Sequence, residues 1–232
     1  MMKKSRISGK IMMTLGLLLT AAALSLSGYN LWGEYQAAKN ANTAFVQVAE
    51  MIPTEVPAST EQETDLSTEP VDGNDVPEFV SNPELDMPVQ MINGLDYIGI
   101  IEIPSLSLKL PILSDWNDEK LKIAPCRYVG SAYAKDLIIS GHSYKNHFRY
   151  IRKLTAGDSV IFTDMDGTRF VYEVSGTEVI RGDGVEEMLS GDWDLSLFTC
   201  TYNGSSRHTV RCRLVPEENP WMGSVDQHLP MD

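Results

Sequence analysis

Basic residues are scarce in this sequence of 232 amino acids, which has 19 lysines and arginines against 32 aspartates and glutamates. The formal net charge is therefore −13 at pH 7. A protein that binds nucleic acid needs a basic face, so this balance argues against a nucleic-acid partner. Hydrophobic residues make up 43% of the chain, which is enough for a substantial core and excludes full disorder.

Cysteine is also rare. The three cysteines are Cys126, Cys200 and Cys212, and this odd number leaves at least one free thiol in an exported protein. No feature of the sequence supports a disulfide between Cys126 and Cys212. Nor do the cysteines and histidines show the paired spacing of a zinc site. We therefore expect neither a metal nor another cofactor.

Charged side chains are absent from residues 11–33, and four basic residues lie in the ten positions before this apolar run. At 1.5 Å per residue a helix of this length spans roughly 30 Å or a little more, enough for the core of a bilayer. Tyr29 and Trp32 lie at its far end, where amphipathic rings favour the membrane interface. The basic end should stay in the cytoplasm, which places everything after Glu34 outside.

A cleaved signal peptide is the alternative interpretation, because the small residues in 21–28 would permit cleavage. The apolar run is longer than the core of a typical signal peptide, which favours a retained anchor. We therefore predict a single-pass protein of the cell membrane, with residues 1–33 as cytoplasmic tip and anchor and a catalytic domain outside the cell.

No basic residue occurs in residues 53–90, which contain ten acidic residues and six prolines. This composition predicts an acidic, extended and disordered stalk that holds a domain away from the membrane. Residues 34–52 lack proline and glycine and should continue the membrane helix. We accordingly divide residues 34–91 from a folded domain over 92–232, and expect that domain to fold and work without residues 1–90.

Helical periodicity is scarce after residue 92, where short runs rich in β-branched residues alternate with turn signals. The predicted strands cover residues 97–104, 106–113, 136–140, 159–163, 169–174, 177–180, 195–201 and 208–215. Short helices are expected over 118–121, 147–154 and 184–189. Many short strands at close spacing indicate an all-β domain, either a barrel or a sandwich.

Cys200 ends one of these strands, and a thiol at a strand rim can meet a substrate while the strand holds it rigid. A small core residue is an equally good interpretation of its position alone. His142 follows a buried-looking strand and could lie beside Cys200, although a lone histidine there is more often a structural hydrogen-bonding group. Cys212 alternates with apolar residues on its strand, which predicts a buried thiol.

Arg207 opens the last strand, seven residues after Cys200. If the two strands form a hairpin, the guanidinium returns close to the thiol, where it would favour a thiolate and bind a developing oxyanion. The alternative is an ordinary surface arginine. Arg211 and Arg213 share its face but lie farther from the loop, so replacement of Arg211 by lysine should matter little.

These residues resemble the signature of the sortases, the cysteine transpeptidases of Gram-positive cell surfaces. Their Thr-Leu-x-Thr-Cys strand is matched by residues 196–200, which read Ser-Leu-Phe-Thr-Cys, with serine for the first threonine. The arginine that opens the next strand is matched by Arg207. The Gly-His that ends an apolar strand is matched by Gly141 and His142.

The likeness covers residues 95–215 and includes two further motifs. A phenylalanine and a Gly-Asp follow the histidine, matched by Phe148 and residues 157–158, and the early Gly-x-Ile-x-Ile-Pro pattern is similar to residues 99–104. The resemblance implies a closed eight-stranded β-barrel. It also implies that Cys200 is the nucleophile, His142 the general acid and base, and Arg207 the stabiliser of the oxyanion or substrate.

For such an enzyme the resemblance implies cleavage of an LPxTG-like sorting signal through a thioester on Cys200. The acyl group then passes to an amine, either a cell-wall peptide amine or a pilin lysine. Two alternatives stay open: a hydrolytic cysteine protease that uses the same residues, and a non-catalytic, membrane-anchored binding module in which Cys200 is structural.

Overall fold

The computed structural model describes residues 9–53 and 77–219 of the chain. The strands are β1 (Gln90–Ile92), β2 (Leu95–Ile103), β3 (Leu108–Leu113), β4 (Cys126–Val129), β5 (Leu137–Ser140), β6 (Ser159–Asp164), β7 (Arg169–Arg181), β8 (Leu195–Cys200) and β9 (Ser206–Leu214). The helices are α1 (Gly9–Met51), α2 (Glu78–Ser81), α3 (Asp118–Leu121) and α4 (Val185–Leu189). Three 3₁₀ segments complete the described chain: η1 (Pro104–Leu106), η2 (Phe148–Lys153) and η3 (Pro216–Glu218).

Eight of the strands close into a barrel. Their order is β2-β3-β4-β5-β8-β9-β7-β6, and β6 pairs back onto β2, while β1 adds a short hairpin strand to the start of β2. The predicted closed eight-stranded β-barrel is therefore confirmed. Closure leaves few free strand edges, which removes the usual site of unwanted pairing between chains.

Closure depends on Gly99 in β2. Its φ is +148°, and a Cβ atom at this position would lie 2.0 Å from the backbone oxygen of Thr163 in β6. Only glycine adopts this conformation without strain and allows the two backbones to approach so closely. The glycine that opens the early sequence motif therefore joins the first long strand of the barrel to β6.

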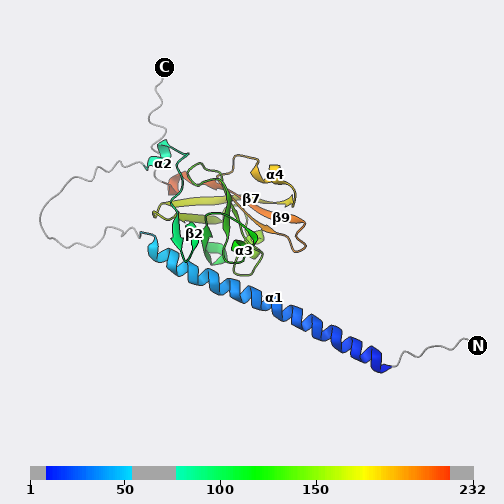
Figure 1. The fold of residues 1–232 in the computed structure, drawn as a ribbon. Helices are drawn as coiled ribbons and strands as arrows, with labels where there is room; N and C mark the ends of the chain where they lie inside the picture. The colour runs from blue at the N-terminus through cyan, green and yellow to red at the C-terminus, as the bar shows by residue number, and fades with distance from the viewer. Residues whose placement is uncertain (1–8, 54–76, 220–232) are drawn as a thin grey trace, which may run out of the picture.

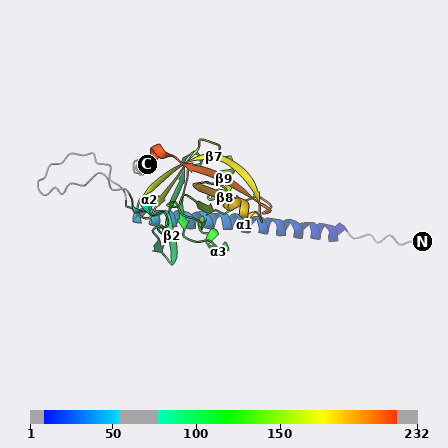
Figure 2. The same ribbon diagram turned by 90° about the horizontal axis from the view of Figure 1, so that it is seen from above.

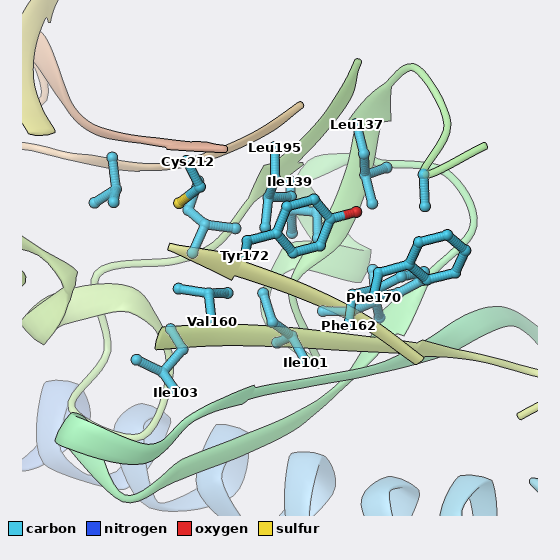
Figure 3. Packing of buried hydrophobic residues seen from close by; sticks show 14 of the residues in the cluster. Ile101, Ile103, Leu137, Ile139, Val160, Phe162, Phe170, Tyr172, Leu195 and Cys212 are labelled. Atoms are coloured by element: carbon cyan, nitrogen blue, oxygen red, sulfur yellow. The ribbon is translucent and has the colours of Figure 1, made fainter. Parts of the chain in front are cut away.

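The core of the barrel is filled by alternate residues of its strands (Figure 3). Phe162 in β6 and Phe170 and Tyr172 in β7 are among the largest fully buried side chains. Side chains of this kind contribute roughly 1.5–3 kcal/mol each when buried. The strands behind the barrel rim are thus held rigidly by packing.

The segments 169–174 and 177–180, predicted as two strands, form the single long strand β7. The Ser175-Gly176 pair, interpreted as a turn, lies where the pairing of β7 with β9 shifts register between Val174 and Gly176. This is a β-bulge, which bends a strand without ending it. Sequence patterns alone do not separate a bulge from a tight turn, because both favour small residues.

Helix α1 has two unlike halves. Its first half is exposed, and by length and composition the helix can cross a membrane. Its second half packs on the barrel through the buried residues Ala37, Ala41, Ala44 and Val48. Their spacing of three or four residues places them on one face of the helix. Figures 1 and 2 show α1 running along the barrel and projecting far beyond it.

The predicted stalk boundary is wrong for residues 77–90. Phe79 in α2 is buried, and its ring stacks on that of Tyr133 with centroids 4.3 Å apart. The predicted stalk over residues 54–76 lies outside the described residues. α1 before it and α2 after it both pack on the barrel.

Candidate active site

Two neighbouring strands bring His142 and Cys200 together. Strands β5 and β8 are parallel, with Ser140 paired to Phe198, and the N–H of Gly141 donates to the Phe198 carbonyl at 2.9 Å. Continued by two residues, this register sets His142 level with Cys200. Both side chains line the same cavity of about 820 Å³, as the strand-end positions predicted.

The antiparallel pairing of β8 with β9 sets Arg207 directly opposite Cys200. This is the hairpin register expected from the sequence. Directly paired residues of an antiparallel pair share a face, and both residues line a second cavity of about 330 Å³. Nη1 of Arg207 donates to the carbonyls of Gly204 and Ser206 at 3.0 and 3.1 Å. The other three N–H groups of the guanidinium, on Nε and Nη2, take no part in these two bonds.

The loop that carries His142 is built on a glycine. A Cβ atom on Gly141 would lie 2.4 Å from the ring of Phe148, so a side chain there would push the ring away. The N–H of Phe148 also donates to the carbonyl of His142 at 3.1 Å. The Gly-His pair and the later phenylalanine of the sequence motif are therefore parts of one packed turn.

The imidazole of His142 is oriented by stacking. Its ring lies on that of Tyr144, with centroids 3.7 Å apart and planes 17° from parallel. Nδ1 is buried and has no hydrogen-bond partner within residues 9–53 and 77–219. An aromatic face thus takes the orienting role that a carboxylate often has beside a catalytic histidine.

Burial lowers the pKa of His142 below its ordinary value of 6.5, and the charges of Lys122 and Arg149 lower it further, while Glu34 opposes them. At neutral pH the ring is therefore mostly uncharged. An uncharged imidazole can accept a proton from a thiol, and the resulting imidazolium is a strong acid.

The other two cysteines differ sharply from Cys200. Burial raises the pKa of the Cys126 thiol to about 12, and it also raises that of Cys212. Cys200 is exposed, and all three thiols are free, so no disulfide joins Cys126 to Cys212. Within the described part of the chain, no group of three or more potential ligands could hold a metal ion. Cys200 is the thiol that a substrate can reach.

The two cavities that meet at Cys200 have different walls. The smaller one, beside Arg207, has a largely apolar lining that includes Trp116, Tyr128, Val185, Met188 and Phe198. The larger one, beside His142, has more polar and charged residues and includes part of α1, although apolar atoms also make up most of its exposed lining. Both sides of the thiol can therefore receive apolar groups, and charged partners are concentrated on the His142 side.

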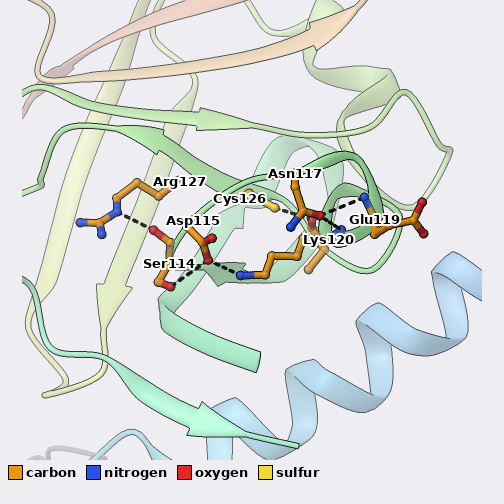
Figure 4. Close-up of polar contacts among 8 residues, drawn as sticks. Ser114, Asp115, Asn117, Glu119, Lys120, Cys126 and Arg127 are labelled. Carbon is orange, nitrogen blue, oxygen red and sulfur yellow. Dashed lines mark hydrogen bonds and ion pairs between the residues drawn. The ribbon is translucent and has the colours of Figure 1, made fainter. Parts of the chain in front are cut away.

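The connection between β3 and β4 contributes to both cavities, and its polar contacts are drawn in Figure 4. The side chain of Asn117 accepts the N–H groups of Glu119 and Lys120 at 3.0 and 2.8 Å, which caps α3. Nε of Arg127 donates to the Ser114 carbonyl at 2.7 Å. Only the short helix was predicted here, and no sequence signal marked this connection as a wall of the site.

Arg211 corrects an expectation. It is buried, and Nε donates to Glu178 at 2.6 Å while Nη1 reaches Ser196 Oγ at 2.8 Å. Its guanidinium also donates to the carbonyls of Glu187 and Met188. A residue that ties α4 to β7, β8 and β9 in this way will not tolerate replacement by lysine, contrary to what the sequence suggested.

An exposed cysteine, a histidine and an arginine meet at one rim of the closed barrel. This arrangement is typical of a cysteine-dependent enzyme. Residues 101–215 match the family model of the Sortase domain, and the chain belongs to the sortase family. A comparison with curated proteins found no match.

Solved structures similar to this chain include several sortases. Sortase C from Streptococcus pneumoniae is 19% identical, with a TM-score of 0.50 over 60% of this chain and 85% of that one. Sortase C from Clostridium perfringens SM101 is 25% identical, with a TM-score of 0.47 over 60% and 82%. Sortase A from Corynebacterium diphtheriae is 22% identical, with a TM-score of 0.47 over 56% of this chain. The present chain spans 62% of the length of that last protein.

Proposed function

We propose that this chain is a membrane-anchored cysteine transpeptidase that cleaves an LPxTG-like sorting signal outside the cell and transfers the acyl group to an amine. One observation carries the proposal: Cys200 is the exposed thiol of the chain and lies where the two cavities meet, level with His142 and opposite Arg207. The position suits a nucleophile flanked by a base and a fixed positive charge.

The chemistry uses each of the three groups. His142 accepts the thiol proton as Cys200 Sγ attacks the scissile carbonyl, and Arg207 donates to the oxyanion of the tetrahedral intermediate. The C–N bond then breaks as the His142 imidazolium protonates the departing amine, which leaves a thioester on Cys200. A second amine attacks the thioester and gives its proton to His142. The C–S bond then breaks as His142 passes that proton to the departing Cys200 sulfur, which restores the thiol.

The cavity linings suggest where the substrates bind. The apolar cavity beside Arg207 suits the leucine and proline of a sorting signal, since burial of such side chains is favourable. The larger cavity beside His142 suits the acceptor, because the amine must lose its proton to that ring. A cell-wall peptide amine and a pilin lysine both meet this requirement.

Trapping the acyl-enzyme tests the proposal. A synthetic LPxTG peptide incubated with the full chain should give a mass shift on Cys200, and the Cys200→Ala variant should give none. With a primary amine present, the product should be the new amide. Release of the free acid at the same rate with and without the amine would indicate a hydrolase, and the absence of any adduct would indicate a binding module.

A further inference from the structure

Helix α1 forms part of the cavity that contains Cys200 and His142. Tyr29 and Trp32, at the end of the apolar run of the helix, and Glu34 and Ala37, just beyond it, line this cavity. Since α1 is continuous from Gly9 to Met51, the span that could lie in a membrane and the wall of the cavity are one rigid element. An anchor that only tethers the domain would not need to contact the site.

A chain of contacts leads from α1 to His142. Glu34 forms an ion pair with Nη2 of Arg149, and the two side chains are 23% and 32% exposed. Nε of the same Arg149 donates at 2.8 Å to the carbonyl of Ser143, the residue after His142. The guanidinium therefore joins the helix to the loop that carries the imidazole, and its two ends bind in fixed directions.

The same loop is covered by α1 at a second point. His147 is fully buried. The backbone of Ala37 in α1 lies close to its ring and acts to raise its pKa. Tyr144 lies between the two histidines, with its centroid 3.7 Å from that of His142 and 5.5 Å from that of His147. The loop is thus packed between the barrel and the helix.

We propose that the part of α1 at the end of its apolar run and just beyond it is a wall of the active site, and that Glu34 is a positioning residue that holds His142 through Arg149. This inference rests on the proposed function and deepens it, because it makes the anchor helix part of the same site. The domain expected to work without residues 1–90 would lack this wall, together with α2 and the first residue of β1.

A double-mutant cycle in the full chain, held in detergent micelles, tests the inference. Glu34→Gln and Arg149→Gln should each slow acylation of Cys200 by about 10-fold, because either change releases the loop. The double variant should be no slower than the slower single variant. Glu50→Gln is the matched control: Glu50 is an exposed carboxylate on the same helix, outside the cavity lining, and its loss should leave the rate unchanged.

The titration of His142, followed by NMR in the same samples, separates positioning from general loss of structure and needs no substrate. The groups that bear on this ring are Lys122 from the β3–β4 connection, Arg149 from η2, Glu34 from α1, and the neighbouring Tyr144, His147 and Cys200. Glu34→Gln removes a negative charge and should move the titration to lower pH. Arg149→Gln removes a positive charge and should move it to higher pH.

The possible results are distinct. An unchanged acylation rate and an unchanged His142 titration in Glu34→Gln, beside an active wild type, would overturn the inference and leave the proposed function intact. A wild type that forms no thioester would overturn the proposed function, and the titration shifts would then show a structural contact without a catalytic consequence, which also ends the positioning role.

Discussion

The two ends of the β8–β9 hairpin carry the same kinds of residue in opposite settings. At the rim, Cys200 is exposed and Arg207 faces a cavity. Toward the other end, Cys212 is fully buried and Arg211 is held by hydrogen bonds to four neighbouring residues. A cysteine and an arginine are therefore accessible or buried according to what surrounds them, and substitutions at the two ends should produce different kinds of failure.

The largest contrast is expected between the two cysteines. Cys200→Ala should lower turnover of a sorting-signal peptide by about 10⁴-fold or more with no loss of stability, because the nucleophile is gone. Cys200→Ser should be nearly inactive, since a hydroxyl forms an anion much less readily. Cys212→Ala should keep the chemistry and lose ~1–2 kcal/mol of stability from a small cavity.

Peptide turnover and denaturant unfolding of the same samples measure this contrast. A thiol reagent gives a third measurement, because Cys200 should be labelled much faster than Cys126 or Cys212. Turnover that persists in Cys200→Ala would show that the rim cysteine is not the nucleophile.

The two histidines extend the comparison to the neighbouring loop. His142→Gln should reduce acylation ~10²–10⁴-fold, the usual value of general acid–base help. His147→Gln should retain most of the activity, because that ring is buried and absent from the cavity lining. Single-turnover kinetics on both variants measure the difference, and equal losses would mean that His142 has a structural role.

Substitutions of the arginines should distinguish effects on catalysis from effects on folding. Arg207→Lys should slow acylation by ~10²–10³-fold with little change in stability, because an ammonium cannot reproduce the fixed N–H directions of a guanidinium. Arg211→Lys should instead lower stability by about 3 kcal/mol or more, since buried groups lose their partners. Arg213, which lies over the ring of Trp193 on the exposed side, supplies the mild control Arg213→Lys.

Burst kinetics and denaturant unfolding on the three arginine variants distinguish these effects. A fully active Arg207→Lys enzyme would remove the arginine from the transition state and leave it a role in binding or in the loop.

The last effect concerns pH and the buried histidine. Burial and the nearby charge of His142 lower the pKa of His147 from 6.5 to about 4. Between these values the unfolded chain binds the proton first, so stability is fully present above pH 6.5 and falls as the pH drops toward 4. The loss should reach about 3 kcal/mol, from roughly 1.4 kcal/mol per pKa unit. Denaturant unfolding of the full chain at several pH values measures it, and His147→Gln should flatten the dependence.

Much of the site could be predicted because the sequence places each functional residue at the end of a strand. The short apolar run before Gly141 and the run before Cys200 have the length and composition of barrel strands. Arg207 was identified because, in a hairpin, the first residues of the second strand lie beside the last residues of the first strand. The roles of these three residues stay predictions until their variants are measured.

The parts that escaped prediction depend on contacts between distant segments. The burial of Phe79 against Tyr133 was hidden inside an acidic, proline-rich segment, where one aromatic residue gives no period. Helix propensity predicted that α1 continues past Gly33, but nothing in it showed that Glu34 meets Arg149, 115 residues later. The buried network of Arg211 was equally invisible, because its four partners come from three separate elements, β7, β8 and α4.

By itself, the sequence determined the apolar helix, the all-β class and the candidate trio of His142, Cys200 and Arg207, because these depend on local composition, period and strand ends. The tertiary structure alone decided that Cys200 rather than Cys126 is exposed, that Arg211 is buried, and that α1 covers the loop beside the thiol. Those properties depend on which side chains are withdrawn from water together, and only the closed barrel with α1 packed against it brings them into contact.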